Sequence, residues 1–192
     1  MLPNNLILQG SEDLPAERIE LAAGPLSMAF EPDTGFLRYV RMGDHEVLRG
    51  IYVAVRDSNW GTVEPEITVQ RLEQGENAFG MTFRAVCQAR EIDFTWTGRI
   101  EGTADGTLVF SMDGEARSTF LRNRIGFCLL HPAACAGVRC RVERVDGSME
   151  EGAFPEAISA HQPFMDIRAI SHEVASDCWA EVRFEGDTFE ME

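Results

Sequence analysis

The strongest constraint on the fold is a two-residue alternation of apolar and polar side chains, which recurs along most of the chain between turn residues. Leu26, Met28 and Phe30 alternate in this way, and a turn at 31–35 leads into a second alternating run at 36–42. Successive strand residues point to opposite faces, so this period is typical of a β-strand with one buried face. No segment carries a sustained apolar stripe of helical period. The sequence therefore predicts an all-β protein that begins with consecutive hairpins.

The same pattern recurs along the rest of the chain, with one interruption. Antiparallel sheets commonly have one buried and one exposed face, and this arrangement produces such alternation. We therefore expect an antiparallel β-sandwich. The alternation fails between Asp146 and Phe164, which predicts a long loop with two prolines and several acids. The other alternating runs lie at 47–56, 79–87, 92–100, 108–112, 125–129, 138–142, 167–173 and 178–184.

The length of 192 residues is enough for one domain with a sizeable core, and no internal repeat or linker interrupts the pattern. We therefore expect a single β-sandwich domain over residues 1–192. Phe189 and Met191 begin another alternating run, which stops at Glu192. This ending predicts a sandwich that is incomplete at its C-terminus and forms the N-terminal portion of a longer, multidomain protein.

The charge balance excludes several classes of function. The formal net charge is −15, and such a surface repels nucleic-acid phosphates and anionic lipid, so we expect neither nucleic acid nor membrane as a partner. All 17 basic residues are arginine. The absence of lysine excludes Schiff-base chemistry and a lysine base.

The five cysteines are odd in number and irregularly spaced, which does not suit a disulfide framework and indicates a reducing, cytoplasmic location. Cys135 and Cys140 could form half of a metal site, but no second pair follows them. Cys87, Cys140 and Cys178 fall on the apolar side of alternating runs, so we expect small buried hydrophobes. The sequence predicts no metal, no cofactor, no signal peptide and no transmembrane helix.

One segment stands out for ligand chemistry, because Arg122, Asn123 and Arg124 open a strand pattern that runs to His131. Two guanidiniums suit a carboxylate or a polyhydroxylated ligand, although they could equally pair with carboxylates of a neighbouring strand. Strict alternation places Asn123 on the face of the odd-numbered apolar residues of 125–129, opposite both arginines. A β-bulge near Arg124 would bring each set to its proper side.

Two further stretches offer candidate site residues. In the turn at 56–62, Asp57 lies beside Trp60, and an aromatic ring next to hydrogen-bonding groups is a common way to hold a sugar. Trp60 could instead close the edge of the core. His131 is a candidate acid–base residue and His161 a candidate ligand contact from the long loop. Strands of one sheet could also bring His131, His161 and His172 together. The sequence lacks the nucleophile elbow, the phosphate-binding glycine loop and the usual zinc motifs.

Four segments together, at 47–63, 118–132, 145–170 and 182–192, resemble the N-terminal part of the D-apionate lactonase family. The opening segment, 23–52, looks like the first hairpins of the galactose-mutarotase-like supersandwich. The resemblance covers the chain from about Ala23 to its end.

This resemblance implies a carboxylic ester hydrolase that opens a sugar lactone to the sugar acid, with further domains downstream that can hold the catalytic residues. On chemical grounds, Arg122, Arg124, His161, Asp57 and Trp60 are the candidates for substrate binding and His131 for catalysis. Two alternatives stay open: a noncatalytic carbohydrate-binding or scaffold sandwich, and an aldose-epimerase-like enzyme, which needs a carboxylate base and a histidine acid in one cleft.

Overall fold

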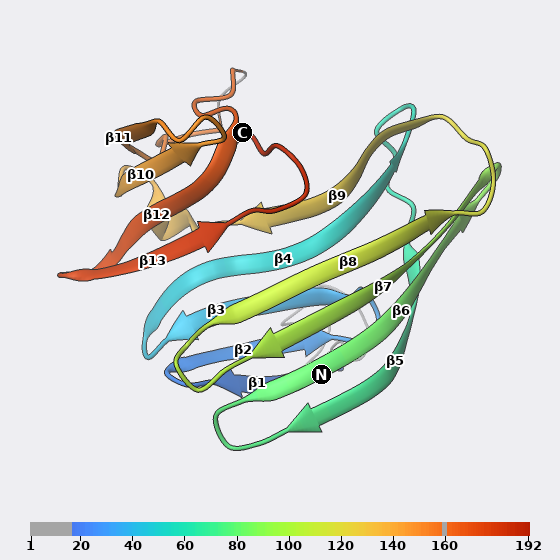
Figure 1. Cartoon of the computed structure of the whole chain (residues 1–192), viewed down its shortest axis with the longest axis horizontal. Coiled ribbons are helices and arrows are strands. Elements are labelled where there is room, and N and C mark those ends of the chain that lie inside the picture. The colour runs from blue at the N-terminus through green and yellow to red at the C-terminus, as the bar shows by residue number, and fades with distance from the viewer. Residues whose placement is uncertain (1–16, 159–160) are drawn as a thin grey trace, which may run out of the picture. The chain divides into compact units, whose positions relative to one another are not determined.

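The computed structural model describes residues 17–158 and 161–192 and is built almost entirely of antiparallel strands (Figure 1). These described residues contain no α-helix, which confirms the all-β prediction, and accordingly no helix among them could cross a membrane. The elements are β1 (Ile19–Ala23), β2 (Leu26–Glu31), β3 (Phe36–Met42), β4 (His45–Asp57), β5 (Pro65–Gln74), β6 (Phe79–Ala89), β7 (Ile92–Gly102), β8 (Leu108–Ala116), β9 (Arg122–Leu130), the 3-10 turn η1 (Ala133–Cys135), β10 (Arg139–Arg144), β11 (Met149–Ala153), β12 (Ile167–Ala175) and β13 (Cys178–Arg183).

The described residues form two compact units. The first contains residues 17–43 and 48–130, and the second contains 44–47 together with the described residues from His131 onward. The single domain expected over residues 1–192 stays a prediction.

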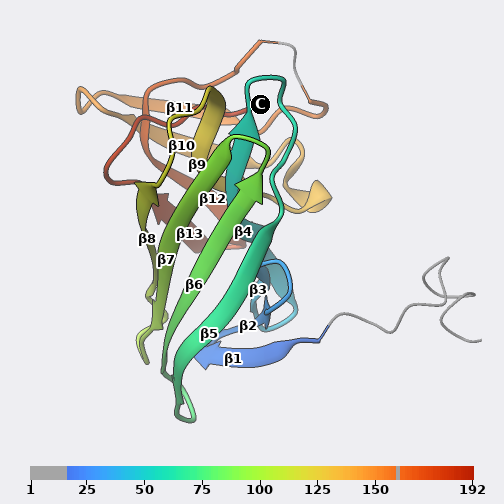
Figure 2. The same cartoon turned by 90° about the vertical axis from the view of Figure 1, so that its right-hand side faces the viewer.

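The first unit is a sandwich of two antiparallel sheets, with strand orders β1-β2-β3-β4-β9 and β5-β6-β7-β8. Figure 2 shows the four strands of the second sheet side by side. Aromatic rings fill the space between the sheets: the Phe30 and Phe83 centroids lie 5.0 Å apart, and so do those of Phe110 and Phe127. Burial of such rings is the main stabilising contribution to the unit.

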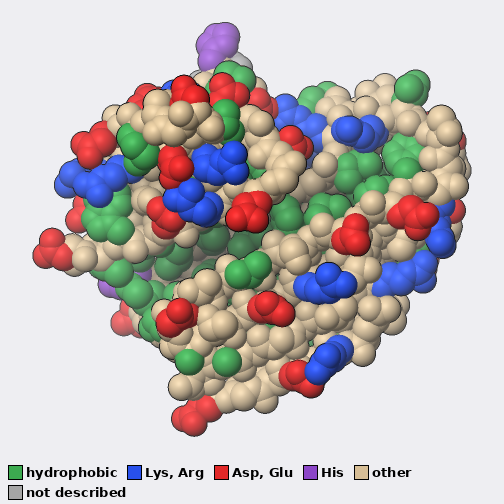
Figure 3. Space-filling model, viewed as in Figure 1, with side chains coloured by type: hydrophobic (Ala, Val, Ile, Leu, Met, Phe, Trp, Pro, Cys, Tyr) green, Lys and Arg blue, Asp and Glu red, His purple; other side chains and the backbone are tan. Residues whose placement is uncertain are grey.

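The outer face of the β5–β8 sheet is polar. Arg84 on β6 and Arg99 on β7 are exposed there, while their neighbours Phe83 and Ile100 are fully buried on the inner face. Acidic and basic side chains are interspersed over this face in Figure 3. The alternation therefore assigns one face to the core and the other to solvent, as predicted.

The second unit is a four-stranded antiparallel sheet of order β11-β10-β12-β13 with its own core. On β10, Cys140 and Val142 are buried, while Arg139 and Arg141 are exposed. The alternation predicted for 138–142 is thus confirmed. The buried residues of this core are Cys135, Cys140, Val142, Phe154, Phe164, Ile167 and Ile170.

The long loop predicted between Asp146 and Phe164 is partly wrong, because it contains strand β11. This edge strand lacks apolar alternation since its acids pair with arginines of β10: Arg141 Nε donates to Glu151 Oε1 at 3.1 Å, and Arg144 pairs with Glu150. Near the end of the chain, Phe189 forms only an isolated bridge with Ile167.

Candidate functional site

The connection from β4 to β5 forms a tight, polar turn at 57–62, which we call the Trp60 turn. Asp57 organises it, because its Oδ1 accepts hydrogen bonds from the backbone N–H groups of Asn59 and Gly61, each at 2.8 Å. The backbone of Asp57 also donates to the Gly61 carbonyl at 2.9 Å. Trp60 has a positive φ of 68° and is 52% exposed. The turn therefore presents the indole to solvent instead of closing the core with it.

Two guanidinium groups lie at the Trp60 turn. Arg56 Nη1 donates to Thr62 Oγ1 at 3.1 Å, and the Arg124 Cζ lies 5.3 Å from the centroid of the Trp60 ring. Arg122 lies opposite Asp57 in the β4–β9 register. The backbones of four predicted site residues, Asp57, Trp60, Arg122 and Arg124, thus lie at one end of β4 and β9, although Nη1 of Arg122 donates its hydrogen bond to the Asn123 carbonyl.

The β9 strand reaches this arrangement through a bulge. Val55 pairs with Ile125 and Asp57 pairs with Arg122, so β9 has one residue more than β4 over this interval. The bulge predicted near Arg124 is confirmed. It lets Phe127 point into the core, against Phe110, while Arg124 reaches the Trp60 ring.

The Asp57 side chain is expected to stabilise the Trp60 turn. Asp57→Ala should lower the free energy of unfolding by about 1 kcal/mol and increase the solvent quenching of Trp60, because two backbone donors lose their acceptor. Urea denaturation and acrylamide quenching measure the two effects. Asp57→Asn, which retains Oδ1, should keep most of the stability. Equal losses in both variants would contradict this role for the oxygen.

His131, which follows β9, lies in the second unit against an aromatic cluster. Its ring centroid is 4.7 Å from that of Phe154 and 5.3 Å from that of His172, with an interplanar angle of 82° to His172. His172 is 1% exposed. Within the described ranges, the two ring nitrogens of His172 have no hydrogen-bond partner. The Nε2 atom of His131 has none there either. The structure thus brings His131 and His172 together.

Burial dominates the protonation of this pair. Burial, with a smaller contribution from the nearby His172, lowers the pKa of His131 to about 4. Burial likewise lowers the pKa of His172. Both imidazoles are therefore neutral at pH 7. A catalytic base must also reach the substrate, and the Nε2 atom of His131 is enclosed. The catalytic assignment of His131 stays a prediction.

His161 lies in the segment between β11 and β12, and its side chain is exposed. It belongs to the second unit, like His131, and its assignment as a ligand contact also stays a prediction.

The cysteines and acids offer little metal or thiolate chemistry. All five cysteines are free, and Cys87 and Cys140 are buried as expected, whereas Cys178 is only half-buried. Burial raises the pKa of the Cys87 thiol to about 11, so it stays protonated at neutral pH. Within residues 17–158 and 161–192, no three His, Cys, Asp or Glu side chains are grouped to hold a metal ion.

The chain is an all-β sandwich protein in which Arg124 lies against the exposed ring of the Trp60 turn. Its sequence also shows its family. It belongs to the family of the D-apionate lactonase N-terminal domain, whose family model matches residues 6–192. It is 39% identical over 188 residues to the D-apionate lactonase of Brucella anthropi. That alignment covers 97% of this chain and 30% of the relative, so the chain spans less than a third of the relative's length.

Proposed function

We propose that this chain is the N-terminal β-sandwich portion of a sugar-lactone hydrolase that opens a lactone of apionate to the sugar acid. The observation that carries the proposal is the 39% identity to a D-apionate lactonase over 97% of the chain. The partners are then a small sugar lactone or acid and downstream domains of the same protein. The free cysteines support a reducing, cytoplasmic location.

Lactone opening needs an activated water, donors that stabilise the oxyanion, and groups that hold the sugar hydroxyls. The Trp60 turn suits the last of these tasks, since its exposed indole lies beside the Arg124 guanidinium and Arg122 is the register partner of Asp57. We therefore assign the Trp60 turn to sugar or carboxylate binding and expect the reacting water to be activated elsewhere in the protein.

The enclosed Nε2 of His131 favours a second candidate function, a noncatalytic sandwich that binds carbohydrate or supports a catalytic domain. The ring contacts of His131 are with Phe154 and His172. These contacts give no support to the aldose-epimerase-like alternative, which needs a carboxylate base beside a histidine acid.

The test is lactone hydrolysis by two proteins: this chain alone, and a chimera that joins this chain to the remaining part of the Brucella anthropi relative. We expect the chimera to hydrolyse apionolactone and the chain alone to be inactive. In the chimera, Arg124→Ala should raise KM about tenfold with little change in kcat, because it removes one charged donor to the ligand.

Arg99→Ala is the matched control, since Arg99 is exposed on the outer face of the β5–β8 sheet. Activity of this chain alone would overturn the expectation that hydrolysis needs the remaining part of the relative. A chimera inactive toward apionolactone, while the intact relative is active in the same assay, would count against the lactonase proposal. An unchanged KM in Arg124→Ala would remove Arg124 from the binding site.

A further inference from the structure

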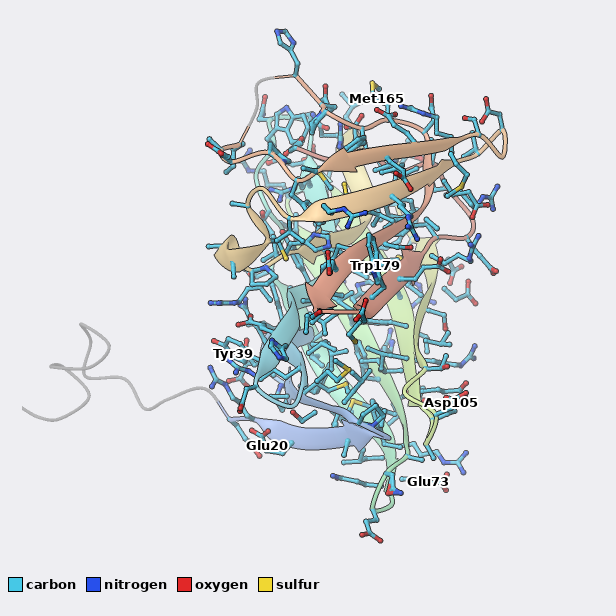
Figure 4. The ribbon with its side chains drawn as sticks, turned by 90° about the vertical axis from the view of Figure 1, so that its left-hand side faces the viewer. Glu20, Tyr39, Glu73, Asp105, Met165 and Trp179 are labelled. Carbon is cyan, nitrogen blue, oxygen red and sulfur yellow. The ribbon has the colours of Figure 1, made fainter. Side chains whose placement is uncertain are left out.

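A second polar site lies on the outer face of β1–β3 in the first unit. An open pocket of about 300 Å³ is found there, and Met28 and Ala29 form the apolar part of its lining. Glu20 on β1 and Tyr39 on β3 can be followed in Figure 4. The polar lining consists of Arg18, Glu20, Ser27, Tyr39 and Arg41.

Tyr39 enters this pocket through a strained backbone. Its φ is 54°, in the left-handed region that favours glycine and costs a side-chain-bearing residue about 1 kcal/mol or more. The cause is a bulge: Ser27 pairs with Arg41 and Ala29 pairs with Arg38, so β3 has one extra residue. A bulge redirects a side chain, and here it turns the Tyr39 ring toward the pocket instead of the core.

A buried carboxylate fixes the arginine at the pocket wall. Glu31 is 6% exposed, and its Oε1 accepts a hydrogen bond from Arg18 Nε at 3.3 Å. Its Oε2 accepts one from Arg38 Nε at 3.1 Å and one from the Thr34 hydroxyl at 3.4 Å. The Arg18 guanidinium is therefore held in place before any ligand arrives, which lowers the entropy lost on binding.

Arginine and tyrosine meet at this wall. The Cζ of Arg18 lies 5.2 Å from the centroid of the Tyr39 ring, and that of Arg49 lies 5.6 Å from the same centroid. The Arg18 side chain remains 44% exposed. It can thus keep its bond to Glu31 and still donate to a ligand, because a guanidinium carries five N–H donors.

We propose that this pocket binds a small hydroxylated carboxylate, the chemical class of a sugar acid. Guanidinium donors match the carboxylate, while the Ser27 hydroxyl, the Tyr39 hydroxyl and the Glu20 carboxylate match ligand hydroxyls. Glu20 and the net charge of −15 disfavour polyanions such as nucleotides. The proposal does not rest on lactone hydrolysis, since it follows from the lining of the pocket alone.

The experiment is isothermal titration of this chain with three probes: D-gluconate, D-glucitol, which has the hydroxyls without the carboxylate, and propionate, which has the carboxylate without the hydroxyls. We expect D-gluconate to bind with a dissociation constant of about 1 mM and the other two at least about tenfold more weakly. No binding of D-gluconate, or equal binding of D-glucitol or propionate, would overturn the proposal.

Two variants locate the site. Arg18→Gln and Tyr39→Gly should each weaken D-gluconate binding about tenfold or more, while Arg84→Gln on the opposite sheet should bind as the unaltered chain does. Tyr39→Gly relieves the strained φ, so it should fold with an unreduced melting temperature and still lose binding. Unchanged affinity in either variant would overturn the site. The lactonase proposal is judged separately, by turnover of the chimera.

Discussion

Replacing Phe83 with alanine is expected to lower the free energy of unfolding of the first unit by about 3–5 kcal/mol. Phe83 is 0% exposed, and its ring lies 5.0 Å from Phe30, 5.2 Å from Trp96 and 6.0 Å from Phe110. These rings come from both sheets, so the cavity would open at the contact that joins the sandwich. A loss of this size is a large fraction of the 5–15 kcal/mol typical of a domain.

Gly98 allows a sharper test of the same core. Gly98 on β7 lies opposite Phe83 on β6, and a Cβ atom at position 98 would overlap the Phe83 ring. Gly98→Ala should therefore destabilise by about 1–3 kcal/mol in the natural chain but by much less in the Phe83→Ala background, where the ring is gone.

Urea denaturation with tryptophan emission as the signal measures both effects in a Trp179→Phe background, where the remaining tryptophans, Trp60 and Trp96, both belong to the first unit. Arg84→Ala, whose side chain points away from the core on the same strand, should change the free energy of unfolding by less than about 0.5 kcal/mol. If the losses for Phe83→Ala and Gly98→Ala are additive in the double variant, Gly98 is not needed to make room for the Phe83 ring.

Alternation predicted the strands whose two faces differ most in polarity. β6 and β7 were found this way, because Phe83 and Trp96 alternate with polar residues that face solvent. β11 was missed because neither of its faces is buried, and its pairing depends on arginines of β10 that the local sequence does not reveal. An edge strand of this kind is stabilised by charge pairs and backbone bonds instead of apolar burial.

The candidate sites, too, could be predicted from the sequence only in part. The bulge near Arg124 could be predicted, because strict alternation would have turned Asn123 to the same side as Phe127. The strained φ of Tyr39 could not, since 36–42 has the pattern of an ordinary strand. The burial of Glu31 depends on Arg18, which is 13 residues away in the sequence. Such long-range pairs carry no local signal.

The burial of the His131 and His172 imidazoles should make the second unit sensitive to acid. Folding lowers the pKa of His131 from the ordinary 6.5 to about 4. Below pH 6.5 the unfolded chain takes up a proton that the folded chain refuses, so the free energy of unfolding falls by up to about 1.4 kcal/mol per pH unit. The loss should reach about 2 kcal/mol at pH 5 and level off near pH 4, and His172 adds to it in the same direction.

His131→Phe isolates this contribution, because it keeps an aromatic ring against Phe154 and cannot be protonated. At pH 7 the variant should be at least as stable as the natural chain, since an enclosed nitrogen without a partner is removed. Between pH 6.5 and 5, the free energy of unfolding of the variant should fall by about 2 kcal/mol less than that of the natural chain. Hydrogen exchange of β10 and β12 amides, corrected for intrinsic rates, reports the second unit directly.

Carboxylates do not obscure this window. Hydrogen bonds from Arg183 and from Ser148 lower the pKa of Glu143 and Asp146, respectively, so the protection that these acids give is lost mainly below pH 5. His45→Gln is the matched histidine control, because His45 is exposed at a hairpin tip and makes no ring contact with the cluster of His131, Phe154 and His172. If His131→Phe and the natural chain lose protection in parallel between pH 6.5 and 5, the His131 imidazole does not resist protonation in the folded state. Its ring would then have to be accessible to solvent, which would restore His131 as a candidate for acid–base work on the sugar lactone.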